Sequence, residues 1–224
     1  MTRDVVIAVD GTAASGKGTL AKRLARHFGF AHLDSGSLYR LTALGVLESG
    51  WSPQNETHAV DAALAIDPSR ANDPAIRTDA VAQAASIVAA FPAVRAALLD
   101  FQRRFASNPP ASAAGAVIDG RDIGTVVCPE APAKLFVDAQ PETRARRRFL
   151  ELMASGATAD EEAVLADIMA RDKRDRERAV APLKPAPDAD LLDTTLLDID
   201  AAFARALALV SPRVGEALKA RHRG

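Results

Sequence analysis

The chain has 224 residues, a formal net charge of −1 and a sequence pI of about 6.4. This balance excludes a general polyanion binder, so any anion site must come from a local cluster of basic residues. The single cysteine, Cys128, excludes an internal disulfide and suits a reducing compartment. The alanine-rich stretch near Val81–Phe91 is too short and too polar to span a bilayer, and no signal peptide fits before the first expected strand. We therefore expect a cytoplasmic protein with no membrane segment.

Short apolar runs alternate with stretches of helical periodicity along the chain. Strands are expected at Val5–Val9, Phe30–Leu33, Ala116–Ile118, Lys134–Val137 and Asp190–Leu192. Helices are expected at Lys17–Phe28, Ser37–Ser49, Val60–Ala65, Asp79–Ala90, Val94–Ala106, Glu142–Ser155, Glu161–Arg178 and Ile199–Val210. The alternation predicts an α/β fold with right-handed βαβ units and a parallel sheet covered on both faces. No strand is expected between Trp51 and Asn108, which predicts a helical excursion over Ser35–Ser107 with a loop at Ile66–Ile76.

The segment Val5–Thr19 has the order of strand, glycine-bounded loop and helix that a phosphate-binding loop requires. Backbone N–H groups of the loop and of the helix start converge on an anion, and Lys17 adds a charge that can reach terminal phosphates. Gly11 and Gly16 allow the backbone to turn and approach closely. Gly18 stands between Lys17 and the hydroxyl of Thr19, and this Gly-Lys-Gly-Thr ending resembles that of nucleoside monophosphate kinases and not that of GTPases or motor ATPases. A tight βα turn with chance glycines is the structural alternative.

Four expected strands end at or run into an aspartate: Asp10, Asp34, Asp119 and Asp138. Ligands of parallel sheets bind at this edge, although aspartate also favours turns and helix N-caps. We assign function to Asp34 and Asp119 and a structural role to Asp138. Asp119 stands where an acid could hold magnesium-bound water. No glutamate follows it to activate water, which favours transfer to a bound acceptor over hydrolysis.

Two further segments at strand ends carry candidate binding residues. Ser35 and Gly36 open a helix that places Arg40 on its first turns, which forms a second anion site or an ordinary capped helix with a surface arginine. A phosphoryl acceptor would suit a second phosphate site beside the first. After the strand that delivers Asp119, Arg121 and Asp122 project from the loop, unless Asp-Gly-Arg-Asp is a chance turn.

The helix expected at Glu161–Arg178 has one narrow stripe, because helical residues advance by roughly 100° each. The stripe starts apolar, ends charged and consists of Val164, Ile168, Arg171, Asp175 and Arg178. A solvated charge run would place its charges opposite the apolar face, so this stripe is predicted to reach a polar cleft, with Arg174 at its edge. The outer face is expected to hold Asp172, Lys173, Arg176 and Glu177. An exposed, ion-paired helix is the alternative.

The arginine cluster Arg144–Arg148 follows the strand at Lys134–Val137. We assign most of it to solvated surface, with one arginine as a candidate for contacting nucleotide. Nucleic-acid binding is disfavoured because the chain has few aromatic residues to stack bases and no net positive charge.

Taken together, these segments resemble the bacterial cytidylate kinases over nearly the whole chain. The resemblance is carried by Asp10–Thr19, Asp34–Arg40, Ile76–Thr78, Ala84–Arg95, Asp119–Val127 and Arg171–Leu183. It implies one P-loop kinase domain over 1–224 with a five-stranded parallel sheet, an insert for the nucleoside monophosphate (NMP) at 35–110 and a lid at 154–178. It also implies transfer of the ATP γ-phosphoryl group to CMP or dCMP with Mg²⁺, by a monomer that binds neither nucleic acid nor membrane.

The resemblance further implies a role for each matching residue. The ATP phosphates would be held by Gly11, Thr12, Ala13, Ala14, Ser15, Gly16, Lys17, Gly18 and Thr19. The acceptor nucleotide would be bound by Ser35, Arg40, Ser86, Arg95, Arg121, Asp122, Arg171, Asp175 and Arg178. Catalysis would rest on Lys17, Arg171, Arg174 and Arg178. Mg²⁺ would be held through nucleotide and water, with Thr19, Asp34 and Asp119 as candidate contacts.

The chain departs from this pattern in the NMP insert. Bacterial relatives usually carry a β-hairpin where this chain has only Ile66–Pro74, so we expect a smaller insert that closes less completely over CMP. Other functions remain as alternatives: a kinase of UMP, AMP or shikimate, a non-catalytic nucleotide-binding module, or an RNA binder that uses Arg144–Arg148 and Arg171–Arg178. A GTPase switch is disfavoured because there is no Asn-Lys-x-Asp motif.

Overall fold

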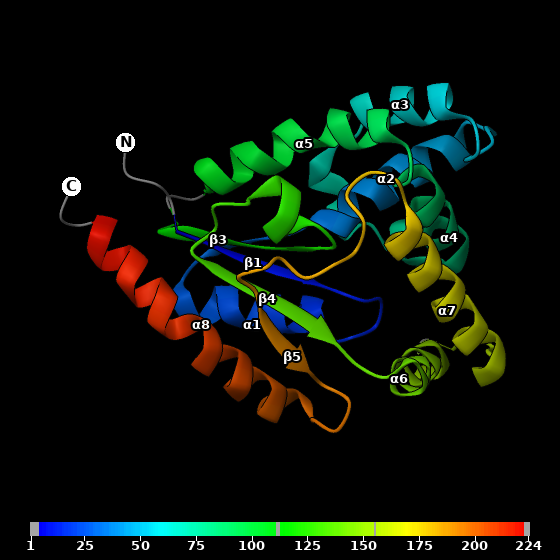
Figure 1. Cartoon of the computed structure of the whole chain (residues 1–224). Helices are drawn as coiled ribbons and strands as arrows, with labels where there is room; N and C mark the ends of the chain where they lie inside the picture. The colour runs from blue at the N-terminus through cyan, green and yellow to red at the C-terminus, as the bar shows by residue number, and fades with distance from the viewer. Residues whose placement is uncertain (1–4, 111–112, 155, 222–224) are drawn as a thin grey trace.

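The computed structural model describes residues 5–110, 113–154 and 156–221. Its centre is one five-stranded sheet in the order β2-β3-β1-β4-β5, and every pairing between neighbours is parallel. The strands are β1 (Val5–Gly11), β2 (Ala31–Asp34), β3 (Gly115–Gly120), β4 (Ala133–Asp138) and β5 (Asp190–Asp193). The predicted α/β class and all five strand positions are therefore confirmed (Figure 1).

Helices cover both faces of this sheet, as the strand–helix alternation predicted (Figure 1). They are α1 (Lys17–Phe28), α2 (Ser35–Glu48), α3 (Glu56–Leu64), α4 (Asp79–Val88), α5 (Pro92–Ser107), α6 (Pro141–Ala154), α7 (Glu161–Glu177) and α8 (Ile199–Arg221). Helices α1 and α8 pack on one face, where Leu20 and Val210 meet the apolar side chains of β1 and β4. On the other face, α5 brings Ala106 against β1 and β3.

Helices α2 to α5 form an excursion with an apolar core of their own, built around Leu38, Val88 and Leu98. The predicted loop at Ile66–Ile76 is more ordered than expected, because two short 3-10 helices occupy it, η1 (Pro68–Asn72) and η2 (Pro74–Arg77). In each, an aspartate caps the first turn and a proline follows it, which is a favourable start for a helical turn.

The C-terminal helix is longer than predicted. The expected end at Val210 is wrong, because α8 continues through Pro212 to Arg221. Proline inside a helix costs about 3 kcal/mol. Val210 and Val214 are fully buried against the sheet on either side of it, and this burial offsets the local cost. For the helix expected at Glu142–Ser155, the last residue, Ser155, lies outside the described residues.

Of the described helices, none is by itself long and apolar enough to cross a membrane, and α4 with α5 passes that test only as a pair bent by 100°.

Candidate functional site

A cavity of about 710 Å³ lies at the carboxyl ends of the central strands, where the loops after β1, β2 and β3 meet α5 and α7. It brings together most of the predicted site residues. They are Ala13, Ala14, Ser15, Gly16, Lys17, Gly18, Thr19, Asp34, Ser35, Arg40, Ser86, Arg95, Asp119, Arg121, Asp122, Arg171, Asp175 and Arg178. Gly11 and Thr12 are buried beneath the loop, and Arg174 lines an adjoining cavity of about 320 Å³.

The loop between β1 and α1 has the backbone geometry of an anion cradle. Ala14 and Gly16 have left-handed φ angles of 57° and 86°, and no side chain caps α1, which leaves its first N–H groups available to a ligand. Gly11 is required sterically, since a Cβ there would lie 1.9 Å from the carbonyl oxygen of Val137. Below the loop, the Thr12 hydroxyl donates to Asp138 Oδ1 over 2.6 Å, in agreement with the structural role expected for Asp138.

Lys17 lies at the start of α1 and reaches back over the loop. Its Nζ donates to the Thr12 carbonyl oxygen over 3.1 Å. Burial, and next the neighbouring Arg121 guanidinium, lower the pKa of Lys17 to about 7. A phosphate at this position would favour the charged form of the amine. The Lys17 ammonium would in turn stabilise an anion bound by the loop.

Two predicted carboxylates stand side by side at the sheet edge, because Asp34 of β2 and Asp119 of β3 are register partners. Asp119 is buried, and its Oδ1 lies 2.8 Å from His32 Nε2, while its Oδ2 faces Gly18. Ser35 Oγ donates to the Asp119 carbonyl oxygen over 2.7 Å. Within the described part of the chain, no group of three or more His, Cys, Asp or Glu side chains could hold a metal ion without other ligands.

Another part of the cavity wall is formed by α2, α5 and the loop after β3. Arg40 donates to the Ile76 carbonyl oxygen over 3.1 Å and so connects α2 to η2. Arg95 of α5 forms a buried ion pair with Asp122 and lies 5.4 Å from the centre of the Tyr39 ring. Asp122 keeps its second oxygen for other partners, and Arg178 lies 3.8 Å from it.

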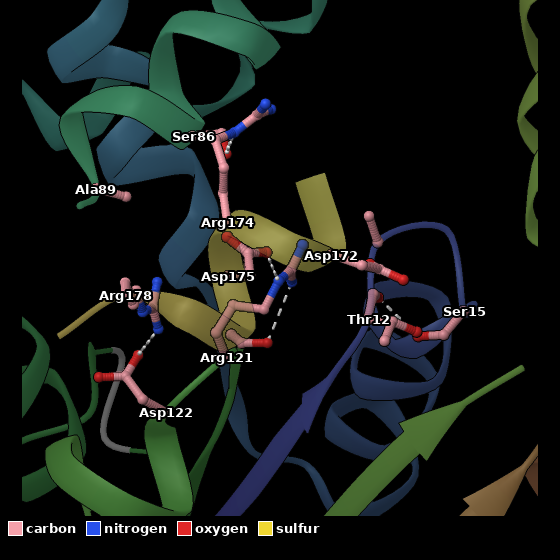
Figure 2. A network of polar contacts seen from close by, with 12 residues as sticks. Thr12, Ser15, Ser86, Ala89, Arg121, Asp122, Asp172, Arg174, Asp175 and Arg178 are labelled. Carbon is pink, nitrogen blue, oxygen red and sulfur yellow. Dashed lines mark hydrogen bonds and ion pairs between the residues drawn. The ribbon is translucent and has the colours of Figure 1, made fainter. Parts of the chain in front are cut away.

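Helix α7 supplies another wall, and its predicted stripe reaches the cavity, although the expected helix end at Arg178 is wrong by one residue, because α7 ends at Glu177 and Arg178 follows with an extended backbone. Ile168 and Asp175 are buried, and Arg171 and Arg178 line the cavity. Figure 2 shows Asp175 accepting from Arg121, Arg174 donating to Ser86 and Arg178 facing Asp122. Beyond α7, Arg178 Nε donates to the Ala181 carbonyl oxygen over 2.5 Å, which directs the rest of its guanidinium inward.

Two surface assignments made from sequence are wrong. Arg144 is 1% exposed, and Asp172, expected on the outer face of α7, is 4% exposed. The two form a buried ion pair, because α6 packs along the flank of α7 that carries Asp172. Lys173, Arg176 and Glu177 are exposed as expected. The rest of the arginine cluster is divided: Arg146 is exposed, whereas Arg147 and Arg148 line the cavity.

Asp10, which was given no site role from the sequence, connects the end of β1 to the segment that follows β3. Its two oxygens accept the backbone N–H groups of Ile123 and Gly124, both over 2.8 Å. These residues open a short π-helix, Ile123–Val127, directly after Asp122. Burial raises the pKa of Asp10 to about 6. Its position at the end of β1 was visible in the sequence, but its distant backbone partners were not.

Known proteins resemble this chain over most of its length. The family model described as "Cytidylate kinase" matches residues 7–211. A cytidylate kinase from Bradyrhizobium diazoefficiens is 55% identical over 206 residues, covering 92% of this chain and 95% of that protein. One from Nitrobacter winogradskyi is 56% identical with the same coverage. Among solved structures, an unliganded sugar kinase from Janibacter sp. superposes with a TM-score of 0.50 at 16% sequence identity. The match covers 94% of this chain and 98% of that protein, and it supports the fold alone.

Proposed function

This chain belongs to the cytidylate kinase family and is an ATP-dependent kinase of CMP or dCMP, and we propose how its own residues divide the work of that reaction. The observation that carries the proposal is the shared cavity, which is lined by the phosphate loop with Lys17, by Arg171 of α7 and by Arg178 directly after α7. The donor phosphates and the acceptor phosphate can therefore meet between one loop and one helix.

On the donor side, we propose that the backbone N–H groups of 11–19 and the Lys17 ammonium bind the ATP phosphates. On the acceptor side, Ser35 and Arg40 bind the CMP phosphate end, while Ser86, Arg95 and Asp122 read the cytosine. A carboxylate can accept a hydrogen bond from the exocyclic amine of cytosine. Among the described ion pairs, the nearest cation to Asp122 Oδ1 is Arg178 at 3.8 Å, which leaves this oxygen able to accept such a bond. Arg121 and Asp175, already paired at 2.8 Å, complete the wall beside the acceptor sugar and phosphate.

We propose Mg²⁺ as the cofactor, held mainly by the substrate phosphates and water. The residues present fit this ion, because Mg²⁺ is commonly bound by one or two carboxylates together with substrate phosphates instead of by a full protein cage. Asp34 and Asp119 are register partners beside the loop, and Asp119 Oδ2 faces the turn that carries Thr19. When bound, the ion would neutralise charge on the phosphates.

The mechanism proposed is in-line phosphoryl transfer. The acceptor is already a phosphate oxyanion, so the protein needs no strong general base, and its contribution is positioning and charge neutralisation. Lys17 lies on one side of the transferring group, and Arg171 and Arg174 of α7, with Arg178 directly after it, approach from the other. Closure of a lid at 154–178 over an insert at 35–110 would exclude water and suppress hydrolysis of ATP.

The experiment that tests this function is ADP formation from ATP and Mg²⁺ with CMP, dCMP, UMP, AMP, GMP or no acceptor. Fast turnover with CMP or dCMP, and almost none without acceptor, is the expected result, and their ratio gives the sugar preference. Turnover without acceptor, or with a purine nucleotide only, would contradict the proposal. An RNA-binding function would instead show steep salt dependence and no acceptor requirement.

Binding of ATP should take up a proton near pH 8, because of Lys17. With a pKa of about 7 in the free protein, Lys17 is mostly neutral at pH 8, and the ATP phosphates favour its charged form, so binding must add up to about one proton per site. Isothermal titration calorimetry in buffers of different ionisation enthalpy measures this uptake. Lys17→Met is the control. Equal proton uptake by the wild type and Lys17→Met would rule out Lys17 as the source.

Lengthening the insert should improve acceptor binding. If the short Ile66–Pro74 connection closes less completely over CMP, a β-hairpin built between η1 and η2 should lower the KM for CMP several-fold and leave the KM for ATP unchanged. A flexible Gly/Ser insertion of the same length is the matched control. An unchanged KM for CMP would count against the smaller insert as the cause of weaker closure.

We also propose that the protein acts as a monomer in the cytoplasm, away from membranes and nucleic acids. The free Cys128 and the near-neutral net charge support this proposal. Light scattering coupled to size exclusion should give a mass close to 23.6 kDa.

A further inference from the structure

A buried ion pair joins α6 to α7 outside the proposed catalytic residues. Arg144 Nη2 donates to Asp172 Oδ2 over 2.5 Å, and the two side chains are 1% and 6% exposed. Neither residue belongs to the described lining of the large cavity. Nothing in the proposed reaction uses either side chain directly, so any effect on turnover must pass through the residues they hold.

The Arg144 guanidinium contacts three separate parts of the chain. Besides Asp172, its Nη1 donates to the carbonyl oxygen of Ala13 in the phosphate loop over 3.2 Å, and its Nε donates to the carbonyl oxygen of Ala139 over 2.8 Å. Ala139 directly follows β4. Because the guanidinium is planar and its donors form a rigid fork, these bonds relate the positions of the sheet edge, the phosphate loop and α7 to one another.

The segment of α7 that this pair holds is the one that carries the catalytic side chains. Asp172 directly follows Arg171 and lies one helical turn before Asp175, which accepts from Arg121. Figure 2 shows Asp172 and Asp175 leaving the same part of α7, near Arg121. A displacement of Asp172 would therefore move several groups that face the phosphates.

Stability alone does not account for such a pair, because a buried ion pair is often no more stabilising than apolar side chains of similar volume. What the pair supplies is a fixed relative orientation of α6, α7 and the phosphate loop, through hydrogen bonds between specific atoms. We propose that Arg144 and Asp172 are positioning residues that hold the α7 arginines at the correct distance from the phosphate loop for phosphoryl transfer. This inference rests on the proposed roles of Arg171 and Arg178.

The test replaces the pair by apolar side chains. The double variant Arg144→Met/Asp172→Leu removes both charges together and leaves no single charge buried without its partner. We expect it to fold with a Tm close to that of the wild type and to lose about 100-fold in kcat, since a displacement of about 1 Å can cost that much. The KM values for CMP and ATP should change less than about threefold, because initial binding does not require the final geometry.

The matched control is Arg146→Met/Glu161→Leu. This pair joins the same two helices over 2.7 Å, but its side chains are 56% and 42% exposed. Its kcat should stay within about twofold of the wild type. Arg144→Lys is a second probe, because it keeps the charge beside Asp172 and loses the fork that reaches Ala13. We expect it to fold and to lose at least about tenfold in kcat.

Each outcome decides the inference. A folded double variant with wild-type kcat would overturn it, and the function would stand as long as the wild type phosphorylates CMP. If the double variant lacks a cooperative thermal transition, Arg144→Lys decides: a lowered kcat with unchanged KM supports positioning, and an unchanged kcat overturns it. Failure of both to fold would assign the pair to the fold and reject the inference. A wild type inactive with CMP would instead reject the proposed function.

Discussion

Replacing Arg178 by alanine should lower kcat with CMP about 10³-fold, the lower end of what an arginine at a transferring phosphoryl group contributes. Burial, and next the neighbouring Arg95, lower the pKa of Arg178, yet a guanidinium stays charged in a protein. The positive charge of Arg178 is therefore buried at a free-energy cost. The negative charge that develops on the transferring phosphoryl group would reduce this cost. The KM for CMP should rise only modestly, because the gain is largest in the transition state.

The matched control for this variant is Arg176→Ala. Arg176 lies two residues earlier on α7, is 53% exposed and approaches Asp138 only at 3.9 Å. Its kcat should stay within about twofold of the wild type. The fold should persist in Arg178→Ala, since the hydrogen bond that Arg178 donates to the Ala181 carbonyl oxygen contributes about 1 kcal/mol. Near-normal turnover in Arg178→Ala, measured by ADP formation, would remove this residue from the site.

The parts of the site that were predictable are those encoded by residues close together in the sequence. The phosphate loop is one continuous segment, and the predicted Lys17–Phe28 helix has the bounds that the structure gives to α1. The stripe through Ile168, Arg171 and Asp175 follows from helical periodicity alone, which needs no knowledge of the neighbouring elements. In both cases the local pattern and the final fold agree.

The parts that could not be predicted depend on which elements become neighbours. Asp172 looked exposed because a helical wheel shows one buried face, whereas α7 packs against α6 on one flank and against α4 on another. The contact of His32 with Asp119 requires β2 to pair with β3, an order of strands that the sequence does not state. Pro212 shows the same limit, since its local preference for ending a helix is outweighed by burial of α8.

Replacing Asp122 by asparagine should lower kcat/KM for CMP by about 10²-fold or more, because a site built around a hydrogen bond loses much of its affinity when its acceptor is lost. Asp122 is buried, and one of its oxygens is bound by Arg95 while the other lies 3.8 Å from Arg178. The exocyclic amine of cytosine would donate a hydrogen bond to the carboxylate oxygen that Arg95 leaves free. An asparagine keeps the shape but brings an NH₂ group and no charge.

Loss of turnover alone would not separate base reading from disturbance of Arg95 and Arg178, so the decisive quantity is the ratio of kcat/KM for CMP to that for UMP. Uracil carries an oxygen where cytosine has its amine, and an asparagine NH₂ can donate to that oxygen. The ratio should therefore fall at least about tenfold in Asp122→Asn.

Asp100→Asn, on the exposed part of α5, is the control that should leave both values unchanged. If Asp122→Asn slows CMP and UMP by the same factor, Asp122 acts only by holding the two arginines, and the cytosine must be read by other groups.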